Sequence, residues 1–316
     1  MSILDPVVLF FILGAIAGIS KSDLKIPESF YNLLSIYLLL SIGIKGGIEL
    51  YKTSFSHIVF PAVGTLVLGV AVTYIAFSIL KVMLGFNLDN AAAIAAHYGS
   101  VSAVTFAVVL SFLRDQNIPY EEFMTVLLVL LEIPAIAVAI FIFRRKQQAT
   151  DLNYKKLLHE IFFGKSMLLL IGGLLIGVFT AYTGNKQLNS FFFDLFKGFL
   201  AIFMLEMGIV ASQRFSDLKK VGVPLIIFGI GMPLLSSILG IVVGYYTGLS
   251  IGGTTVLATM AASASYIAAP AAIQLAIPQA NPTYYLTAAL GITFPFNIIF
   301  GISIYHYLTK EFFKFI

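Results

Sequence analysis

Glu132 is the residue whose position in the chain most clearly points to chemistry. This carboxylate interrupts the apolar run Leu127-Leu-Val-Leu-Leu-Glu132-Ile-Pro134. Placing an acidic side chain at the centre of a membrane costs about 2.5–3.5 kcal/mol on insertion scales, so such residues are functional candidates. The carboxylate could bind Na⁺ or carry a proton. The alternative is a protonated acid that only hydrogen-bonds between helices. Glu206 is the second acid within an apolar segment.

Two runs of small and hydroxylated residues, 95–105 and 261–270, interrupt other apolar segments. Small residues let helices approach closely, and hydroxyl groups both donate and accept hydrogen bonds. If each helix breaks within its run, a half-helix N-terminus presents free N–H groups and a partial positive charge, which suits an anion. The carbonyl groups at the opposite half-helix ends suit Na⁺. The alternative is that these residues serve helix packing alone.

These two runs and Glu132 supply the candidate site. The candidate substrate-binding residues are Gly99, Ser100, Ser102, Ala103, Thr105, Ser263, Ala264 and Ser265. The candidate Na⁺ ligands are Ser102, Glu132, Ser265 and Tyr266. Pro270 is expected to interrupt the second helix and to free the carbonyl of Tyr266. We expect no cofactor and no metal other than Na⁺, because cysteine is absent and the four histidines are scattered.

The composition defines the class of protein that must position these residues. Charged residues make up 11% of the 316-residue chain and hydrophobic residues 59%, with a mean hydropathy of +0.98. A soluble domain carries about 25% charged residues. The composition therefore excludes a soluble enzyme, a nucleic-acid-binding module and a disordered chain. Apolar runs near 20 residues recur, which indicates an all-α polytopic membrane protein.

Ten apolar segments can be delimited. Their approximate limits are 4–20, 29–44, 58–83, 89–113, 121–143, 165–182, 194–211, 222–246, 251–277 and 283–308. The loops that follow the odd-numbered segments carry more lysine and arginine than the other loops. The excess of positive charge on cytoplasmic loops then predicts that both termini lie outside, and we expect a plasma-membrane location.

The two halves of the chain repeat one another. The matched positions, in the same order in each half, are Gly14 with Gly173, Gly43 with Gly208, Pro61 with Pro224, Ser102 with Ser265, and Pro134 with Pro295. Each half holds five segments, and an odd number inverts the second copy in the membrane. We therefore predict two five-helix repeats, 1–143 and 165–316, joined by a basic cytoplasmic loop, 144–164. Inverted repeats are typical of secondary transporters, although a duplication without transport is the alternative.

Several stretches resemble the sodium-dependent bicarbonate transporter family, best known from cyanobacteria. They are residues 22–28, 34–47, 98–102, 118–121, 132–134 and 277–282. The resemblance covers nearly the whole chain. It implies ten helices in two inverted repeats arranged as a core and a gate domain, with HCO₃⁻ and Na⁺ bound between the serine-rich half-helices. It also implies elevator-type alternating access, a homotrimer and a cytoplasmic PII-like regulatory protein.

Two positions depart from the family pattern. Glu132 stands where the cyanobacterial members carry aspartate, and Tyr266 stands where they carry an acidic residue.

Together, the repeat, the candidate site and the family resemblance predict a secondary active transporter that imports bicarbonate in symport with Na⁺. The alternative is a proton- or sodium-coupled symporter of another small anion on the same fold. We do not expect an enzyme, because neither a His-Glu-x-x-His motif nor an intramembrane Asp pair is present. A membrane sensor that does not transport is a further alternative.

Overall fold

The computed structural model describes residues 5–147, 154–184 and 190–315, and the regular elements in these ranges are helices. The α-helices are α1 (Pro6–Ile19), α2 (Glu28–Lys52), α3 (Phe55–Ser78), α4 (Leu88–Gly99), α5 (Ala103–Asp115), α6 (Met124–Gln147), α7 (Tyr154–Phe163), α8 (Lys165–Thr183), α9 (Phe196–Phe215), α10 (Leu218–Tyr246), α11 (Ile251–Ala261), α12 (Ala268–Ala276), α13 (Pro282–Leu286), α14 (Phe294–Phe296) and α15 (Ile302–Phe315). The π-helical turns are η1 (Ile79–Met83), η2 (Ser190–Asp194), η3 (Thr287–Thr293) and η4 (Asn297–Gly301).

Eight helical stretches in the described ranges are long and apolar enough to cross a membrane. They are Glu28–Lys52, Phe55–Met83, Leu88–Asp115, Met124–Arg145, Lys165–Thr183, Phe196–Phe215, Leu218–Tyr246 and Pro282–Phe315. The two other predicted segments fall on the shorter α1 and on α11 with α12. Large apolar side chains such as Phe60, Val67 and Ile227 are exposed on the long helices, which fits a lipid environment. The chain is thus a multi-pass membrane protein.

Local sequence signals define several helix ends. The Asp5 carboxylate accepts a hydrogen bond from the Val7 N–H at 2.8 Å and caps α1. The Ser250 hydroxyl caps α11 in the same way. Gly222 has φ +80°, so it separates the first turn of α10 from the long helix that follows. This break lies where the sequence predicts the eighth segment to begin.

Two predicted boundaries need correction. Helix α2 continues to Lys52 rather than ending near residue 44, because Lys52 pairs with Glu49 at 2.9 Å one turn earlier and such pairs support a helix. The predicted loop 144–164 contains helical residues at both ends, the last turn of α6 and all of α7. Helix α7 packs on α8 and α12. Residues 148–153 of that loop, and residue 4 of the first segment, lie outside the described residues.

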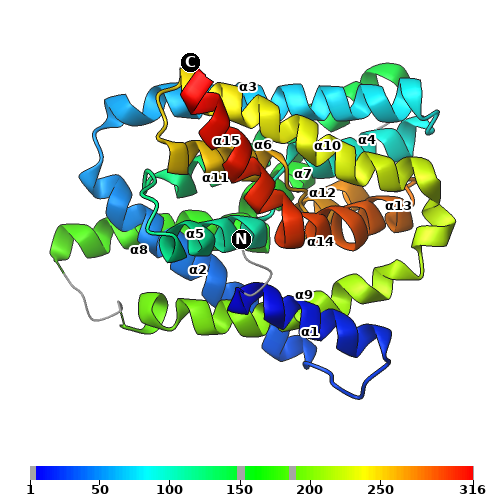
Figure 1. Ribbon diagram of the computed structural model, residues 1–316. Coiled ribbons are helices and arrows are strands. Elements are labelled where there is room, and N and C mark those ends of the chain that lie inside the picture. The colour runs from blue at the N-terminus through cyan, green and yellow to red at the C-terminus, as the bar shows by residue number, and fades with distance from the viewer. Residues whose placement is uncertain (1–4, 148–153, 185–189, 316) are drawn as a thin grey trace.

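The helices pack in two groups (Figure 1). Helices α1, α2, α8 and α9 form the four-helix group, in which α1 lies along α9 and α2 along α8. Glycines line both contacts: a Cβ added to Gly173 would lie 2.9 Å from the Cα of Gly43, and one added to Gly208 would overlap the backbone of α1 near Gly14. Small residues of this kind allow helices to approach closely in a membrane.

A second group, which we call the crossing group, contains α3 to α6 and α10 to α15, and α7 packs on both groups through α8 and α12. Helices α3 and α10 run side by side along its outer face (Figure 1). Helix α3 also packs on α4 and α6, while α10 packs on α11 and α15. This group contains both serine-rich runs, so it positions the candidate site.

Two contacts join helix ends that the sequence predicts on the same side of the membrane. Asp115 pairs with Lys197 at 2.7 Å, and these residues belong to loops or helix ends predicted outside. Lys165 donates to Asn32 at 2.9 Å, and both lie at helix ends predicted to face the cytoplasm. Residues predicted on one side of the membrane therefore contact others predicted on that side.

Candidate functional site

Both serine-rich helices are interrupted inside their runs. Helix α4 ends at Gly99 and α5 begins at Ala103, while α11 ends at Ala261 and α12 begins at Ala268. Ser100 and Ser102 between the first pair have extended backbones, with ψ of −174° and 111°. The predicted breaks are therefore present. We call residues 100–102 and 262–267 together the crossing.

Two hydrogen bonds join the interrupted segments across the crossing. The Ser102 N–H donates to the Ser263 hydroxyl at 2.9 Å, and the Ser265 N–H donates to the carbonyl of His97 at 2.8 Å. Each break exposes backbone groups that a continuous helix would satisfy internally. Because each segment satisfies a donor of the other, the two breaks stabilise one another at depth, where unpaired polar groups are costly.

The serine hydroxyls have distinct roles. Ser102 Oγ accepts from the Thr105 N–H at 3.2 Å, and Ser265 Oγ accepts from the Ala269 N–H at 3.2 Å. Each serine thereby caps the half-helix that follows it. Ser100 Oγ is buried and has no hydrogen-bond partner within the described ranges. Ser100 and Ser265 use no hydroxyl proton in the hydrogen bonds of the described residues, so each can donate to a ligand, whereas the Ser102 hydroxyl lies close to that of Tyr266.

Ser263 differs from the other three serines. Its hydroxyl donates to the Met260 carbonyl at 2.7 Å while accepting from the Ser102 N–H. Both functions of the hydroxyl are therefore used to hold the two breaks together.

Tyr266 and His97 carry further polar atoms at the crossing. The Tyr266 hydroxyl is buried near Ser102 but has no hydrogen-bond partner among the described side chains, and its ring packs against Phe294 at 5.4 Å. His97 Nδ1 lies 2.7 Å from the Ala93 carbonyl. A carbonyl can only accept, so Nδ1 carries the proton and the buried Nε2 is an acceptor.

The remaining predicted residues lie around the crossing. Gly99 packs against α3, since an added Cβ would overlap the hydroxyl of Thr73. Thr105 and Ala264 are buried. Ala103 begins α5 and lines a cavity described next. These positions bring the substrate-binding candidates together in one region of the crossing group.

Three cavities lie where the two helix groups meet. The Ala103 cavity, of about 10 Å³, is lined by Ala103 and Ile267 of the crossing group and by apolar residues of α2 and α9. The Glu132 cavity, of about 200 Å³, is lined by Glu132, by Ile267 and Ala268 at the start of α12, and by Lys165 of α8. Glu132 is buried, with 6% of its surface exposed. Glu132 and the start of α12 thus line the same cavity. Within the described ranges, no direct contact between Glu132 and the serines of the crossing is found.

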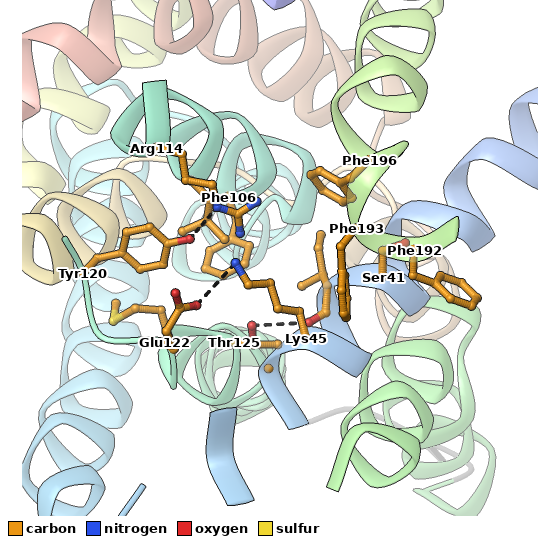
Figure 2. Close-up of a pocket in the computed structure, with 14 residues that line it drawn as sticks. Ser41, Lys45, Phe106, Arg114, Tyr120, Glu122, Thr125, Phe192, Phe193 and Phe196 are labelled. Atoms are coloured by element: carbon orange, nitrogen blue, oxygen red, sulfur yellow. Dashed lines mark hydrogen bonds and ion pairs between the residues drawn. The ribbon is translucent and has the colours of Figure 1, made fainter. Parts of the chain in front are cut away.

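The third cavity, the Lys45 cavity, has a volume of about 50 Å³. It lies between α2 and η2 on one side and α5 with the segment before α6 on the other, and charged residues line it (Figure 2). It shares Ile42 with the Ala103 cavity, which in turn shares Ile267 with the Glu132 cavity. The three cavities therefore follow one another along the boundary between the groups.

Sequence reasoning missed two residues that hold the crossing. The Asn297 amide donates to the Ala262 carbonyl at 2.8 Å, and the Tyr305 hydroxyl donates to Asn297 at 2.6 Å. Both residues are fully buried. An asparagine within the apolar tenth segment was the available signal, because a buried amide must find hydrogen-bond partners.

The prediction for Pro270 needs correction. Helix α12 begins at Ala268, so Pro270 lies in the first turn, where its missing N–H interrupts no helical hydrogen bond. Tyr266 lies before this helix, and the break at Tyr266 is therefore not caused by the proline. Pro295 lies in α14, directly after the π-helical turn η3.

Comparison with known families identifies the family to which the chain belongs. A family model described as the Na⁺-dependent bicarbonate transporter superfamily matches residues 6–310, nearly the whole length. No curated protein sequence matches the chain. The matched region contains both interrupted helices, Glu132 and all three cavities. The chain belongs to the Na⁺-dependent bicarbonate transporter superfamily.

Proposed function

We propose that this protein is a secondary active transporter that imports bicarbonate in symport with Na⁺, and that both ions bind at the crossing. One observation carries the assignment. Ser100, Ser102 and Ser265 are buried beside the N-termini of α5 and α12, and the hydroxyl protons of Ser100 and Ser265 are available to a ligand.

The crossing suits a small anion for two reasons. Helices α5 and α12 both begin there, and each helix N-terminus carries a partial charge of roughly +0.5. The serine hydroxyls can donate to the oxygens of a bicarbonate ion that has lost its water. Hydrogen bonds to a charged group contribute more than those between neutral groups, which helps to offset the cost of dehydrating the anion.

Oxygen donors near the crossing can hold the coupling Na⁺. We propose Ser102, Ser265 and the unpartnered Tyr266 hydroxyl as its neutral ligands. Glu132 supplies the one carboxylate of the proposed set, from the cavity that borders α12. The negative charge of this residue balances the cation.

An inverted repeat also accounts for the packing of the four-helix group. The repeat pairs Gly14 with Gly173 and Gly43 with Gly208. Gly14 contacts α9 near Gly208, while Gly173 contacts Gly43. Exchanging each glycine for its repeat partner converts one contact into the other, as expected for two copies related by a two-fold axis in the membrane plane.

We propose that the crossing group moves against the four-helix group during transport, in an elevator-type cycle. The surfaces that face each other at the Ala103 cavity are almost wholly apolar, including Leu38, Leu39 and Phe203. Apolar surfaces of this kind can slide, and the buried Thr125 hydroxyl of α6, which donates to the Ile42 carbonyl of α2 at 3.5 Å, would change its partner as they do so. The larger cavities at either end of this boundary would then be the two access routes. A homotrimer, a PII-like regulator and a plasma-membrane location with both termini outside remain predictions.

Coupling to protons, with bicarbonate or another small anion as substrate, is the second candidate. It is favoured by Tyr266, which puts a neutral side chain where the family carries an acid, and which leaves Glu132 as the one acid of the proposed site. A buried carboxylic acid that opens onto a cavity can carry a proton as well as bind Na⁺.

Uptake of labelled bicarbonate into proteoliposomes tests the proposal. We expect uptake to require an inward Na⁺ gradient and to persist when the pH gradient is removed. Ser102→Ala and Ser265→Ala should raise the KM for bicarbonate, because each removes a donor. Glu132→Gln and Tyr266→Phe should raise the Na⁺ concentration needed for half-maximal uptake.

Ser237→Ala is the matched control, because this serine is buried in α10 and donates only to the Leu234 carbonyl. It should transport like the wild type. Uptake that is unchanged when choline replaces Na⁺ but follows a pH gradient would establish proton coupling instead. Normal kinetics in all four site variants would rule out the crossing as the binding site.

A further inference from the structure

The Lys45 cavity carries charged residues for which the proposed binding site has no role. Its walls come from both helix groups, and its charged residues point toward one another across the space between them (Figure 2). The polar and charged residues that line it are Ser41, Lys45, Arg114, Tyr120, Glu122 and Thr125.

Two cations face a single acid in this cavity. The Lys45 ammonium lies 3.6 Å from the Glu122 carboxylate. Arg114 instead donates through Nε to the Tyr120 hydroxyl at 2.9 Å, and no carboxylate of the described residues lies within 4.0 Å of its guanidinium. Burial raises the pKa of the Tyr120 phenol, which keeps this side chain neutral.

Three other acids on this side of the molecule have partners of their own. Glu49 pairs with Lys52, and Asp115 pairs with Lys197. Glu121 accepts hydrogen bonds from the Ser250 N–H and hydroxyl. The charged residues that line the cavity, Lys45, Arg114 and Glu122, therefore carry a net positive charge.

The dimensions of the cavity fit a small ion. A single water needs at least about 10–15 Å³ of such volume, and the Lys45 cavity has about 50 Å³. An inorganic anion of four heavy atoms fits this space. Phe106, Phe192, Phe193 and Phe196 form apolar walls, and charges act more strongly on an ion beside apolar walls than in open water.

The cavity also leads toward the crossing. Helix α5 runs from Arg114 at the mouth of this cavity to Ala103 at its own first residue, and both cavities are lined by Ile42 of α2. An anion held at the mouth would therefore lie on the boundary along which the crossing is reached.

We propose that Lys45 and Arg114 form a capture site for a small inorganic oxyanion, distinct from the crossing, and that Glu122 limits how tightly this site holds the ion. The inference rests on the proposed function, since it gives the same substrate an initial binding site before the crossing. Weak retention is required, because an ion that binds too strongly at the mouth would not proceed.

Initial rates of bicarbonate uptake give the first test. Lys45→Gln and Arg114→Gln should each lower kcat/KM about three- to tenfold with kcat little changed, because steering by charge acts on association. Arg114→Lys should recover most of the loss. Glu122→Gln should act in the opposite direction and raise kcat/KM. Lys52→Gln is the matched control, because this exposed lysine lies on the same helix as Lys45 but pairs with Glu49. Its kcat/KM should equal that of the wild type.

Added inert salt should reduce the differences among these variants, because it screens the charges. Equal kcat/KM in wild type, Lys45→Gln and Arg114→Gln, with bicarbonate uptake intact, would overturn the capture site and leave the proposed function standing.

Thiol labelling gives a second test that does not depend on transport. The chain has no cysteine, so Phe193→Cys places a single thiol in the cavity wall. We expect a negatively charged thiol reagent to react faster there than a positively charged one of similar size, when compared with Tyr182→Cys at an exposed position outside the cavity. Adding Lys45→Gln or Arg114→Gln should lower this ratio, and Glu122→Gln should raise it.

Bicarbonate should slow the labelling of the Phe193→Cys thiol and leave that of Tyr182→Cys unchanged. A labelling ratio that is the same with and without Lys45→Gln, Arg114→Gln and Glu122→Gln would overturn the inference. A charge-dependent ratio with anion protection, in a protein that takes up no bicarbonate under either gradient, would support the capture site and contradict the proposed function.

Discussion

At the scale of single residues, serines of the same type divide into two kinds. Ser263 uses its hydroxyl both as donor and as acceptor to hold the breaks together. Ser100 uses its hydroxyl for neither in the contacts that the structure describes. The two serines look alike in the sequence. Their hydrogen bonds show that Ser263 stabilises the fold, whereas the Ser100 hydroxyl is free to bind a ligand.

This division predicts opposite phenotypes for two similar variants. Ser263→Ala leaves the buried Ser102 N–H without its acceptor, which costs about 1–3 kcal/mol, so the midpoint of thermal unfolding in detergent should fall. Ser100→Ala removes no hydrogen bond and should unfold like the wild type while its uptake is impaired. Equal stability of the two variants, measured side by side, would contradict this division of roles.

At the scale of helices, glycine contacts hold the four-helix group together. Gly173 lies against the backbone of α2, whereas its neighbour Gly172 has no atom within 4 Å of the position of an added Cβ. The two adjacent glycines therefore provide an internal comparison, because they share a helix and differ only in the face that they occupy.

Gly173→Ala should destabilise the protein, because the new methyl group would meet backbone atoms of α2 that cannot rotate away, and overpacking typically costs about 1–3 kcal/mol. Gly172→Ala should be neutral or slightly stabilising, since alanine favours helix by about 1 kcal/mol over glycine. Thermal unfolding of the two variants measures the difference. If Gly172→Ala were as destabilising as Gly173→Ala, the close contact of α2 and α8 would not be its cause.

At the scale of the whole molecule, relative movement of the two helix groups is the central proposal. The Asp115–Lys197 ion pair connects them, because Asp115 ends α5 of the crossing group and Lys197 lies on α9 of the four-helix group. The Lys165–Asn32 hydrogen bond, in contrast, connects two members of the four-helix group. These two pairs allow movement between groups to be separated from movement within one.

Cysteine pairs at these positions test the movement. With a short bifunctional thiol reagent, Asp115→Cys with Lys197→Cys should lose bicarbonate uptake, because the cross-link ties the two groups. Asn32→Cys with Lys165→Cys should keep its uptake after the same treatment. A monofunctional reagent should leave both double variants active. Full uptake by the cross-linked first pair, with cross-linking verified by mass, would exclude a cycle in which the groups slide past each other.

Much of this architecture follows from the sequence. Apolar length and low charge predict membrane helices from local signals, so the eight long spans of the described residues and the two helix breaks follow from the sequence. The sequence does not predict α7 within loop 144–164, because this short helix is stabilised by packing on α8 and α12. Similarly, α2 extends past its apolar stretch because a local ion pair supports its last turn.

The tertiary structure decided which polar atoms remain available. Sequence identifies a serine but not its hydrogen-bond partner, because the partners of Ser263 and of the Ala262 carbonyl come from different segments of the chain. The Lys45 cavity was hidden for the same reason, since Lys45 and Arg114 are far apart in sequence and ordinary at the ends of membrane segments. The composition and periodicity of the chain thus determined a membrane bundle with polar breaks. Packing alone placed two breaks against each other and two cations around one cavity, because contacts between distant residues depend on how the helices assemble.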